Sequence, residues 1–156
     1  MGLDMYLMKT LRGSRLQSNN STEIAYWRKA NQIHDWFVKN VQNGYDDCGK
    51  YEVTKEDLQA LLSTCKDVLA SITLVDMDTS LNDINDEWPD AVKIGKTIKD
   101  PTLAKKLLPT CPGFFFGDIE YDEIYKDNIE RTIEQLEKVL RETNFNNYKI
   151  TYQSSW

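Results

Sequence analysis

The sequence is poor in the residues that define several common classes of protein. It has three cysteines, Cys48, Cys65 and Cys111, without a C-x-x-C spacing, and a single histidine. These side chains are too scattered for a disulfide framework or an ordinary structural zinc site, so we expect an intracellular, reduced protein with no metal and no other cofactor. No apolar run approaches the roughly 20 residues of a membrane helix, and we expect no membrane partner.

Basic residues are in the minority as well. The chain has 19 Lys and Arg against 25 Asp and Glu, which gives a formal net charge of −6. Direct binding to a nucleic-acid backbone depends on clustered cations, so we expect none. Six of the acids lie between Asp76 and Asp90, where there is no base. Part of this stretch has the spacing of a calcium loop, but Leu81 stands where that loop requires glycine, so a solvated acidic loop is favoured.

Alternating apolar residues predict strands at about 3–8 and 148–153, and three phenylalanines between two glycines predict a short strand at 114–116. Helical spacing and capping signals predict helices at about 22–43, 55–72, 101–108 and 121–142. Cys65 lies in the apolar stripe of the second helix, so we expect it to pack as a small hydrophobic residue.

The segment at about 73–100 has no clear period, and we interpret it as an acidic irregular insertion. The remaining elements do not alternate as strand and helix, which disfavours a parallel α/β sheet. We therefore predict one globular domain, residues 1–156, of the α+β class. Its expected architecture is a small, mainly antiparallel three-stranded sheet packed with three or four helices.

A catalytic interpretation centres on His34. It is either a core histidine, bonded to a backbone carbonyl or to Asn31, or a general base at a cleft. The loop that follows its helix, Asp46-Asp47-Cys48-Gly49, offers Asp47 and Cys48 as assisting groups. Two adjacent carboxylates disfavour an activated thiolate at Cys48, which argues against a cysteine nucleophile.

Trp36 lies roughly opposite the apolar face of the same predicted helix. Lys29, Gln32 and Lys39 share its side, so that two cations border an aromatic ring. Such a face can stack a base and hold a phosphate, or act as a hot spot for a protein partner. The alternative is that the C-terminal segment or the 73–99 insertion covers Trp36.

Eight segments are distinctive in combination: Met1-Gly2-Leu3-Asp4-Met5-Tyr6-Leu7, Tyr26-Trp27-Arg28-Lys29-Ala30-Asn31, Ile33-His34-x-Trp36-Phe37-Val38, Asp46-Asp47-Cys48-Gly49, Leu107-Leu108-Pro109-Thr110, Gly113-Phe114-Phe115-Phe116-Gly117, Tyr121-Asp122-Glu123 and Tyr152-Gln153-Ser154-Ser155-Trp156. Together they resemble a family of small, uncharacterised proteins carried by bacteriophages and prophages. The resemblance implies a setting in the bacterial cytoplasm, where such proteins serve host takeover or counter-defence by binding a host protein or sequestering a nucleotide signal.

These segments also concentrate residues that folding alone does not require, and we expect them to meet at one cleft. They are Trp27, Arg28, Lys29, Asn31, His34, Asp46-Asp47-Cys48-Gly49, Tyr121 and Gln153-Ser154-Ser155-Trp156. The predicted function is a non-catalytic, phage- or prophage-derived binding protein that blocks a host protein or sequesters a nucleotide-like ligand, through this group or through Trp36 and its lysines.

Two other functions stay open. One is a small enzyme acting on a nucleotide-like substrate, with His34 as base and Asp47 or Cys48 assisting. The other is acidic mimicry of nucleic acid by residues 76–90. Assembly into an oligomer is compatible with each of the three.

Overall fold

The computed structural model describes residues 2–13, 21–76, 96–113 and 116–156. Its main sheet is antiparallel, with the strand order β2-β1-β6-β3, and its strands are β1 (Asp4–Leu11), β2 (Ser21–Arg28), β3 (Tyr51–Val53) and β6 (Tyr148–Ser155). A separate two-stranded ladder joins β4 (Leu74–Asp76) and β5 (Lys96–Ile98). The helices of the described part are α1 (Asn31–Asn40), α2 (Lys55–Ser71), α3 (Thr102–Leu107) and α4 (Glu123–Glu142). The predicted α+β class is confirmed.

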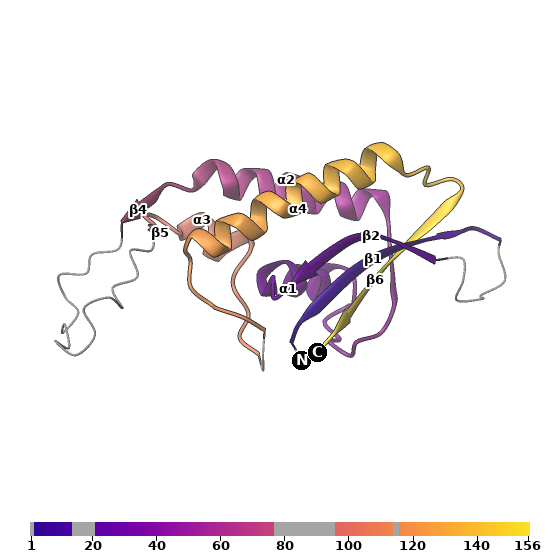
Figure 1. Cartoon of the computed structure of the whole chain (residues 1–156), viewed down its shortest axis with the longest axis horizontal. Coiled ribbons are helices and arrows are strands. Elements are labelled where there is room, and N and C mark those ends of the chain that lie inside the picture. Colours follow the sequence, from indigo (N-terminus) through magenta and orange to yellow (C-terminus); the bar gives the residue numbers. More distant parts are fainter. Residues whose placement is uncertain (1, 14–20, 77–95, 114–115) are drawn as a thin grey trace.

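The helices cover one face of the main sheet. Helices α2 and α4 lie side by side along it, and α3 lies with the β4–β5 ladder toward one end of this pair (Figure 1). Helix α1 packs against the sheet through Phe37. The ring of Phe37 stacks on that of Tyr152 in β6, with the centroids 4.0 Å apart and the planes 9° from parallel. The core therefore lies between the inner face of the sheet and the helices, where large apolar side chains are removed from water.

Residues 21–28 form β2, so the helix predicted at 22–43 is wrong in its first third. Burial alternates along this strand, because Ala25 and Trp27 are buried while Tyr26 between them is exposed. Trp27, Ala30 and His34 are all buried, and their spacing in the sequence matches one face of a helix. However, Trp27 belongs to β2 and His34 belongs to α1. Lys29, at φ 56°, turns the chain between the strand and the helix, and α1 then runs only from Asn31 to Asn40.

The main sheet has four described strands and not the predicted three, because β2 and β3 belong to it. Phe116 is buried but lies outside any strand, and residues 114 and 115 fall outside the described part of the chain. Two ends of the expected irregular insertion pair as β4 and β5. The interior of this insertion, residues 77–95, lies outside the described residues. Most of residues 76–90, for which we predicted mimicry of nucleic acid, therefore also lies outside them.

The other helices agree with the prediction to within about two residues, which is the usual spread of helix boundaries. Helix α2 begins at the expected capping box, since the Thr54 hydroxyl accepts from the Asp57 amide while the Asp57 carboxylate accepts from the Thr54 amide. Cys65 is fully buried in its apolar stripe, as predicted. None of the helices in the described ranges is both long and apolar enough to cross a bilayer.

The buried hydrogen bond between Trp27 and Thr132 gives a test of the β2 assignment. The indole Nε1–H of Trp27 donates to Thr132 Oγ1 at 2.9 Å and joins β2 to α4. Thr132→Val keeps the shape of the side chain but leaves the indole without an acceptor, so we expect the free energy of unfolding to fall by about 1–3 kcal/mol in urea titrations. Thr64→Val is the control, because its hydroxyl bonds only to a carbonyl of its own helix, where we expect less than about 0.5 kcal/mol. Equal losses in the two variants would contradict the assignment.

Candidate functional site

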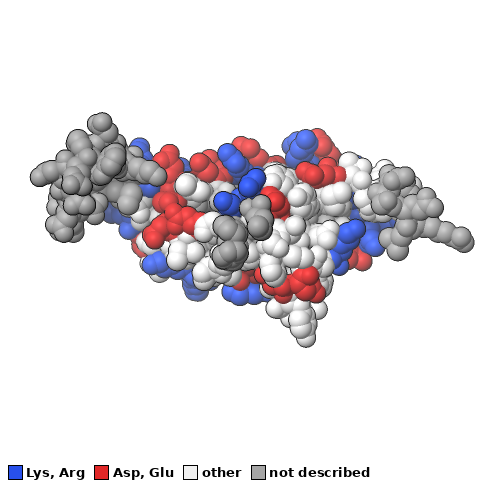
Figure 2. Space-filling view, turned by 60° about the horizontal axis from the view of Figure 1, so that its bottom comes forward, with Lys and Arg blue, Asp and Glu red and all other residues white. Residues whose placement is uncertain are grey.

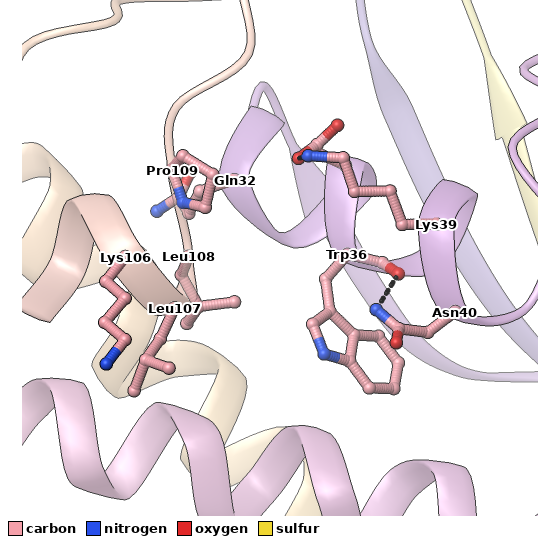
Figure 3. A pocket seen from close by; sticks show the side chains of 9 residues that line it. Gln32, Trp36, Lys39, Asn40, Lys106, Leu107, Leu108 and Pro109 are labelled. Atoms are coloured by element: carbon pink, nitrogen blue, oxygen red, sulfur yellow. Dashed lines mark hydrogen bonds and ion pairs between the residues drawn. The ribbon is translucent and has the colours of Figure 1, made fainter.

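A pocket of about 150 Å³ lies between α1 and the residues at the end of α3 (Figure 3). This volume is below the roughly 300–1,000 Å³ of typical ligand pockets, so the pocket can enclose only a part of a ligand. One wall comes from α1 and the other from the chain around the end of α3, and the lining residues are Gln32, Asp35, Trp36, Lys39, Asn40, Lys106, Leu107, Leu108 and Pro109. Residues three or four apart on a helix share a face, which is why Gln32, Trp36 and Lys39 line one wall together.

Trp36 supplies the flat apolar surface of the pocket. Its ring is half-buried and is held edge-on against Phe37, with the centroids 5.4 Å apart and the planes 87° from parallel. Among the described residues, no acceptor bonds to its indole N–H. In Figure 3 the indole nitrogen faces the side on which Leu107 and Lys106 lie. The pocket therefore offers a stacking surface, and at its edge lies an indole donor to which no described residue bonds.

The charges of the pocket are unequally compensated. Lys39 Nζ bonds to Asp35 Oδ2 at 2.6 Å, and this hydrogen bond raises the pKa of Lys39 above its ordinary value. Lys106 has no ion pair within the described part of the chain. Among the described lining residues, Lys39 is thus paired with a carboxylate, whereas Lys106, which is exposed, is not.

Two carboxamides complete the lining. Gln32 is buried, and its Nε2 lies 3.5 Å from the carbonyl of Tyr125, whereas Asn40 Nδ2 donates to the Trp36 carbonyl at 2.8 Å (Figure 3). The carbonyl oxygens of both side chains receive no hydrogen bond from the residues described. A ligand with N–H donors therefore finds two acceptors on α1, one turn before and one turn after Trp36.

Asn31 fixes the segment that follows the second wall of the pocket. It is 1% exposed, its Nδ2 donates to the carbonyls of Phe116 and Asp118 at 3.1 and 3.0 Å, and its Oδ1 accepts from the Cys111 amide at 2.9 Å. Tyr121 secures the same segment, since its phenol oxygen accepts from the Thr110 amide at 3.0 Å. Asn31 and Tyr121 are thus placed to hold the backbone rather than to contact a ligand.

His34 lies on the buried face of α1 and not in the pocket. It is 1% exposed, its Nδ1 lies 2.6 Å from the Tyr152 hydroxyl and its Nε2 lies 3.0 Å from Asp46 Oδ1. His34 is therefore buried in the core, as one of its two interpretations expected. The hydrogen-bond partners of His34 are neither a backbone carbonyl nor Asn31. Burial also raises the pKa of the Tyr152 phenol well above its ordinary value. Both imidazole nitrogens are occupied, so neither is available to a substrate in this arrangement.

The loop after α1 and the end of β6 meet at the outer side of this network. Trp156 is exposed, and its indole donates to Asp46 Oδ1 at 2.9 Å. Gln153 Nε2 donates to the carbonyl of Cys48 at 3.0 Å. Asp47 is exposed and does not bond to His34, because its carboxylate accepts from the Gly49 amide and the Tyr51 hydroxyl, which together lower the pKa of Asp47.

The residues singled out from the sequence do not meet at one cleft. Trp36 and Lys39 line the pocket. His34, Gln153 and Trp156 belong to the network around Asp46, and Asp47 and Cys48 lie in the adjoining loop. Trp27 is buried against α4, whereas Arg28 and Lys29 are exposed between β2 and α1 and do not line the pocket.

Sequence reasoning missed the second wall of the pocket and did not identify Asp46 as the partner of His34. Lys106 and Leu107 lie in the short predicted helix at 101–108, and nothing local indicates which helix they face. Asp46 stands next to Asp47, and only the fold selects it as the partner of His34. Within the described ranges, no group of three or more His, Cys, Asp or Glu side chains is placed to hold a metal ion.

The surface shown in Figure 2 carries Lys and Arg interspersed with Asp and Glu, without an extended basic region on that face. Comparison with known proteins finds no matching family model, no matching curated protein and no matching solved structure. The phage resemblance accordingly stays a prediction, and the geometry of the pocket carries the argument about function.

The Asn31 bonds can be tested by removing its carboxamide. Asn31→Ala leaves one buried and two partly buried backbone groups without their partner, so we expect a loss of about 1–3 kcal/mol in the free energy of unfolding and faster amide exchange at Cys111. Asn144→Ala is the control, since its side chain bonds only within an exposed turn. Hydrogen exchange followed by mass spectrometry measures the effect. Unchanged exchange across 109–121 in Asn31→Ala would show that this residue does not hold the segment.

The three thiols differ in environment and so in reactivity. Burial raises the pKa of Cys65 to about 12, whereas Cys48 and Cys111 are only half-buried. Because the thiolate is the reactive form, a disulfide reagent at pH 8 should leave Cys65 unmodified in the folded protein and modify it in urea. Peptide mapping after labelling identifies the modified residue. Labelling of Cys65 as fast as Cys48 in native buffer would contradict its placement in the core.

Proposed function

We propose that the protein is a non-catalytic binding protein that takes up a small nucleotide-like anion in the Trp36 pocket. The observation that carries the proposal is one cavity that combines a half-buried indole, an indole N–H without an acceptor among the described residues and the uncompensated ammonium of Lys106. Each of these matches a different part of a nucleotide.

The chemistry of the three groups is complementary. A base stacked on an aromatic side chain gains about 1–3 kcal/mol. A lysine ammonium such as that of Lys106, which is exposed at the rim of the pocket, binds phosphate as a point charge. The Asp35–Lys39 pair holds the Lys39 side chain against α1, which keeps that side of the pocket ordered before a ligand arrives.

Binding rather than catalysis is favoured by the lining. Among the described residues, the lining contains no Ser, Thr, Cys, Tyr or His, and its one carboxylate there, Asp35, is paired with Lys39. His34 does not line the pocket, and both of its ring nitrogens are hydrogen-bonded. These contacts do not support the alternative of an enzyme that uses His34 as its base.

The resemblance to phage and prophage proteins supplies the setting of the proposal. A binding protein of this kind acts in a bacterial host cell by sequestering a nucleotide-like ligand that the host uses. Blocking of a host protein is the other form of the same function, for which exposed Trp156 is the side chain best suited.

Calorimetric titration with adenosine, guanosine, cytidine and uridine nucleotides tests the proposal. We expect Trp36→Ala and Lys106→Ala each to weaken the nucleotide that binds best by at least about fivefold, because each removes a contact of about 1 kcal/mol or more. Lys138→Ala is the matched control, since this exposed lysine of α4 lies away from the lining. Circular dichroism verifies that the variants fold. The proposal fails if no nucleotide binds the wild type, or if binding survives both substitutions.

A further inference from the structure

We infer that two copies of this chain associate through the face of the main sheet that lies opposite the helices, which we call the open face. Tyr6 and Tyr26 lie at its centre, and Glu23 and Arg28 lie on either side of that centre along β2. The inference goes beyond the proposed function, because the Trp36 pocket is lined from α1 and the end of α3 on the helical side of the sheet. The two can therefore be tested separately.

The alternation of side chains along the strands defines the open face. Successive side chains of a strand point to opposite faces of the sheet, and Met5 and Trp27 are buried in the core on the helical side. Their neighbours Tyr6 and Tyr26 consequently point to the other face. The cross-strand register places Tyr26, Tyr6 and Gln153 in one row across β2, β1 and β6. We call these three residues the tyrosine row.

The open face carries residue types that are common in protein interfaces. The ring centroids of Tyr6 and Tyr26 lie 5.3 Å apart, and the Tyr26 hydroxyl donates to the Asp4 carboxylate, which holds this ring on the open face. Tyr26 is 39% exposed, and Tyr6 and Met8 are half-buried. Tyrosine, methionine and arginine are enriched in interfaces relative to the rest of the protein surface. These large side chains therefore keep surface that a second copy can bury.

Two exposed charges of β2 flank the tyrosine row. The register pairs Arg28 with Asp4 and Glu23 with Met8 on β1. Asp4 and Met8 are each two residues from Tyr6, so the guanidinium and the carboxylate lie on opposite sides of the row at matched positions. Within the described part of the chain, neither Arg28 nor Glu23 forms an ion pair. Both charges are therefore available to a second copy.

A twofold axis along the tyrosine row makes the open face complementary to itself. Most soluble oligomers are symmetric, and two packed sheets keep their strands within about 30° of each other. Rotation about this axis places Tyr26 against Tyr26 of the second copy, and it places Arg28 against Glu23 of the second copy twice in the dimer. An axis along β1 would instead oppose Asp4 to its own copy, and like charges that face each other disfavour association. The charges therefore select one arrangement.

A second copy fits the open face better than a nucleic acid does. Bases stack on aromatic rings, but a single strand also needs a positively charged groove that follows its backbone. Asp4 and Glu23 place carboxylates beside the tyrosine row, where they repel phosphates. A surface that carries both signs of charge suits an isologous contact, in which the same patch is present on both sides.

Sedimentation equilibrium of the full chain, over a range of concentrations, tests the inference. We expect the wild type to show a reversible equilibrium between monomer and dimer. Arg28→Glu and Glu23→Arg should each weaken dimer formation by at least about fivefold, because each substitution sets like charges opposite one another at both symmetry-related contacts. Lys138→Glu is the matched control, since this exposed lysine lies on α4, and it should leave the equilibrium unaltered.

A mixture of the two variants is the decisive sample. Chains with Arg28→Glu and chains with Glu23→Arg place opposite charges at both contacts when they are combined, so a mixed dimer should form with nearly the affinity of the wild type. Both substitutions in one chain should restore dimer formation in the same way. A misfolded variant would not be restored by its counterpart, and circular dichroism verifies the fold of each chain.

The inference is overturned if the wild type is monomeric at every concentration. It is also overturned if the two variants associate as tightly as the wild type, or if their mixture associates no better than each variant alone, because a different surface then joins the copies. Nucleotide binding is decided independently of these results. Trp36→Ala should leave the dimer intact, and Arg28→Glu should leave the affinity for nucleotide unaltered, because the pocket and the open face lie on different sides of the sheet.

Discussion

The buried carboxamide of Asn31 is the contact on which the candidate site depends. It stands at the first turn of α1 and bonds to three backbone groups, those of Cys111, Phe116 and Asp118. The wall formed by Leu107 and Pro109 lies just before Cys111 in the sequence. Because a buried carboxamide is costly to leave unpaired, the three bonds favour this position of the chain beside α1.

The two faces of helix α1 carry polar groups in different states of hydrogen bonding. On the face toward the sheet, Phe37 stacks on Tyr152 and His34 has a partner at each ring nitrogen. On the face toward the pocket, Trp36 and Gln32 keep polar atoms that no described residue satisfies. Fully paired polar groups stabilise a single packing, whereas groups left open at a cavity are those a ligand can use. This contrast is the reason for placing the function at the pocket and not at the only histidine.

The parts of the fold that were predictable are those specified locally. Helix α2 has its own capping box and a regular apolar stripe, so no distant contact is needed to recognise it. Strand β2 was missed because Trp27 and His34 share helical spacing, and because the turn between strand and helix is made by Lys29 at positive φ, a residue that gives no warning of a left-handed conformation. In the site, the α1 face was predictable once a helix was placed there. The Tyr152 partner of His34 is 118 residues away, and only the assembled sheet brings it there.

The most direct test of nucleotide binding at this pocket is an amide-proton NMR titration that observes the tryptophan indole N–H signals. Trp36→Phe assigns the signal of Trp36, and AMP is the titrant. The signal of Trp36 should move progressively and saturate, because its N–H lies at the edge of the pocket, while that of Trp27 stays in place because it is bonded to Thr132 in the core. A titration in which AMP leaves the Trp36 signal unmoved, or moves that of Trp156 instead, would contradict the assignment of the pocket as the binding site.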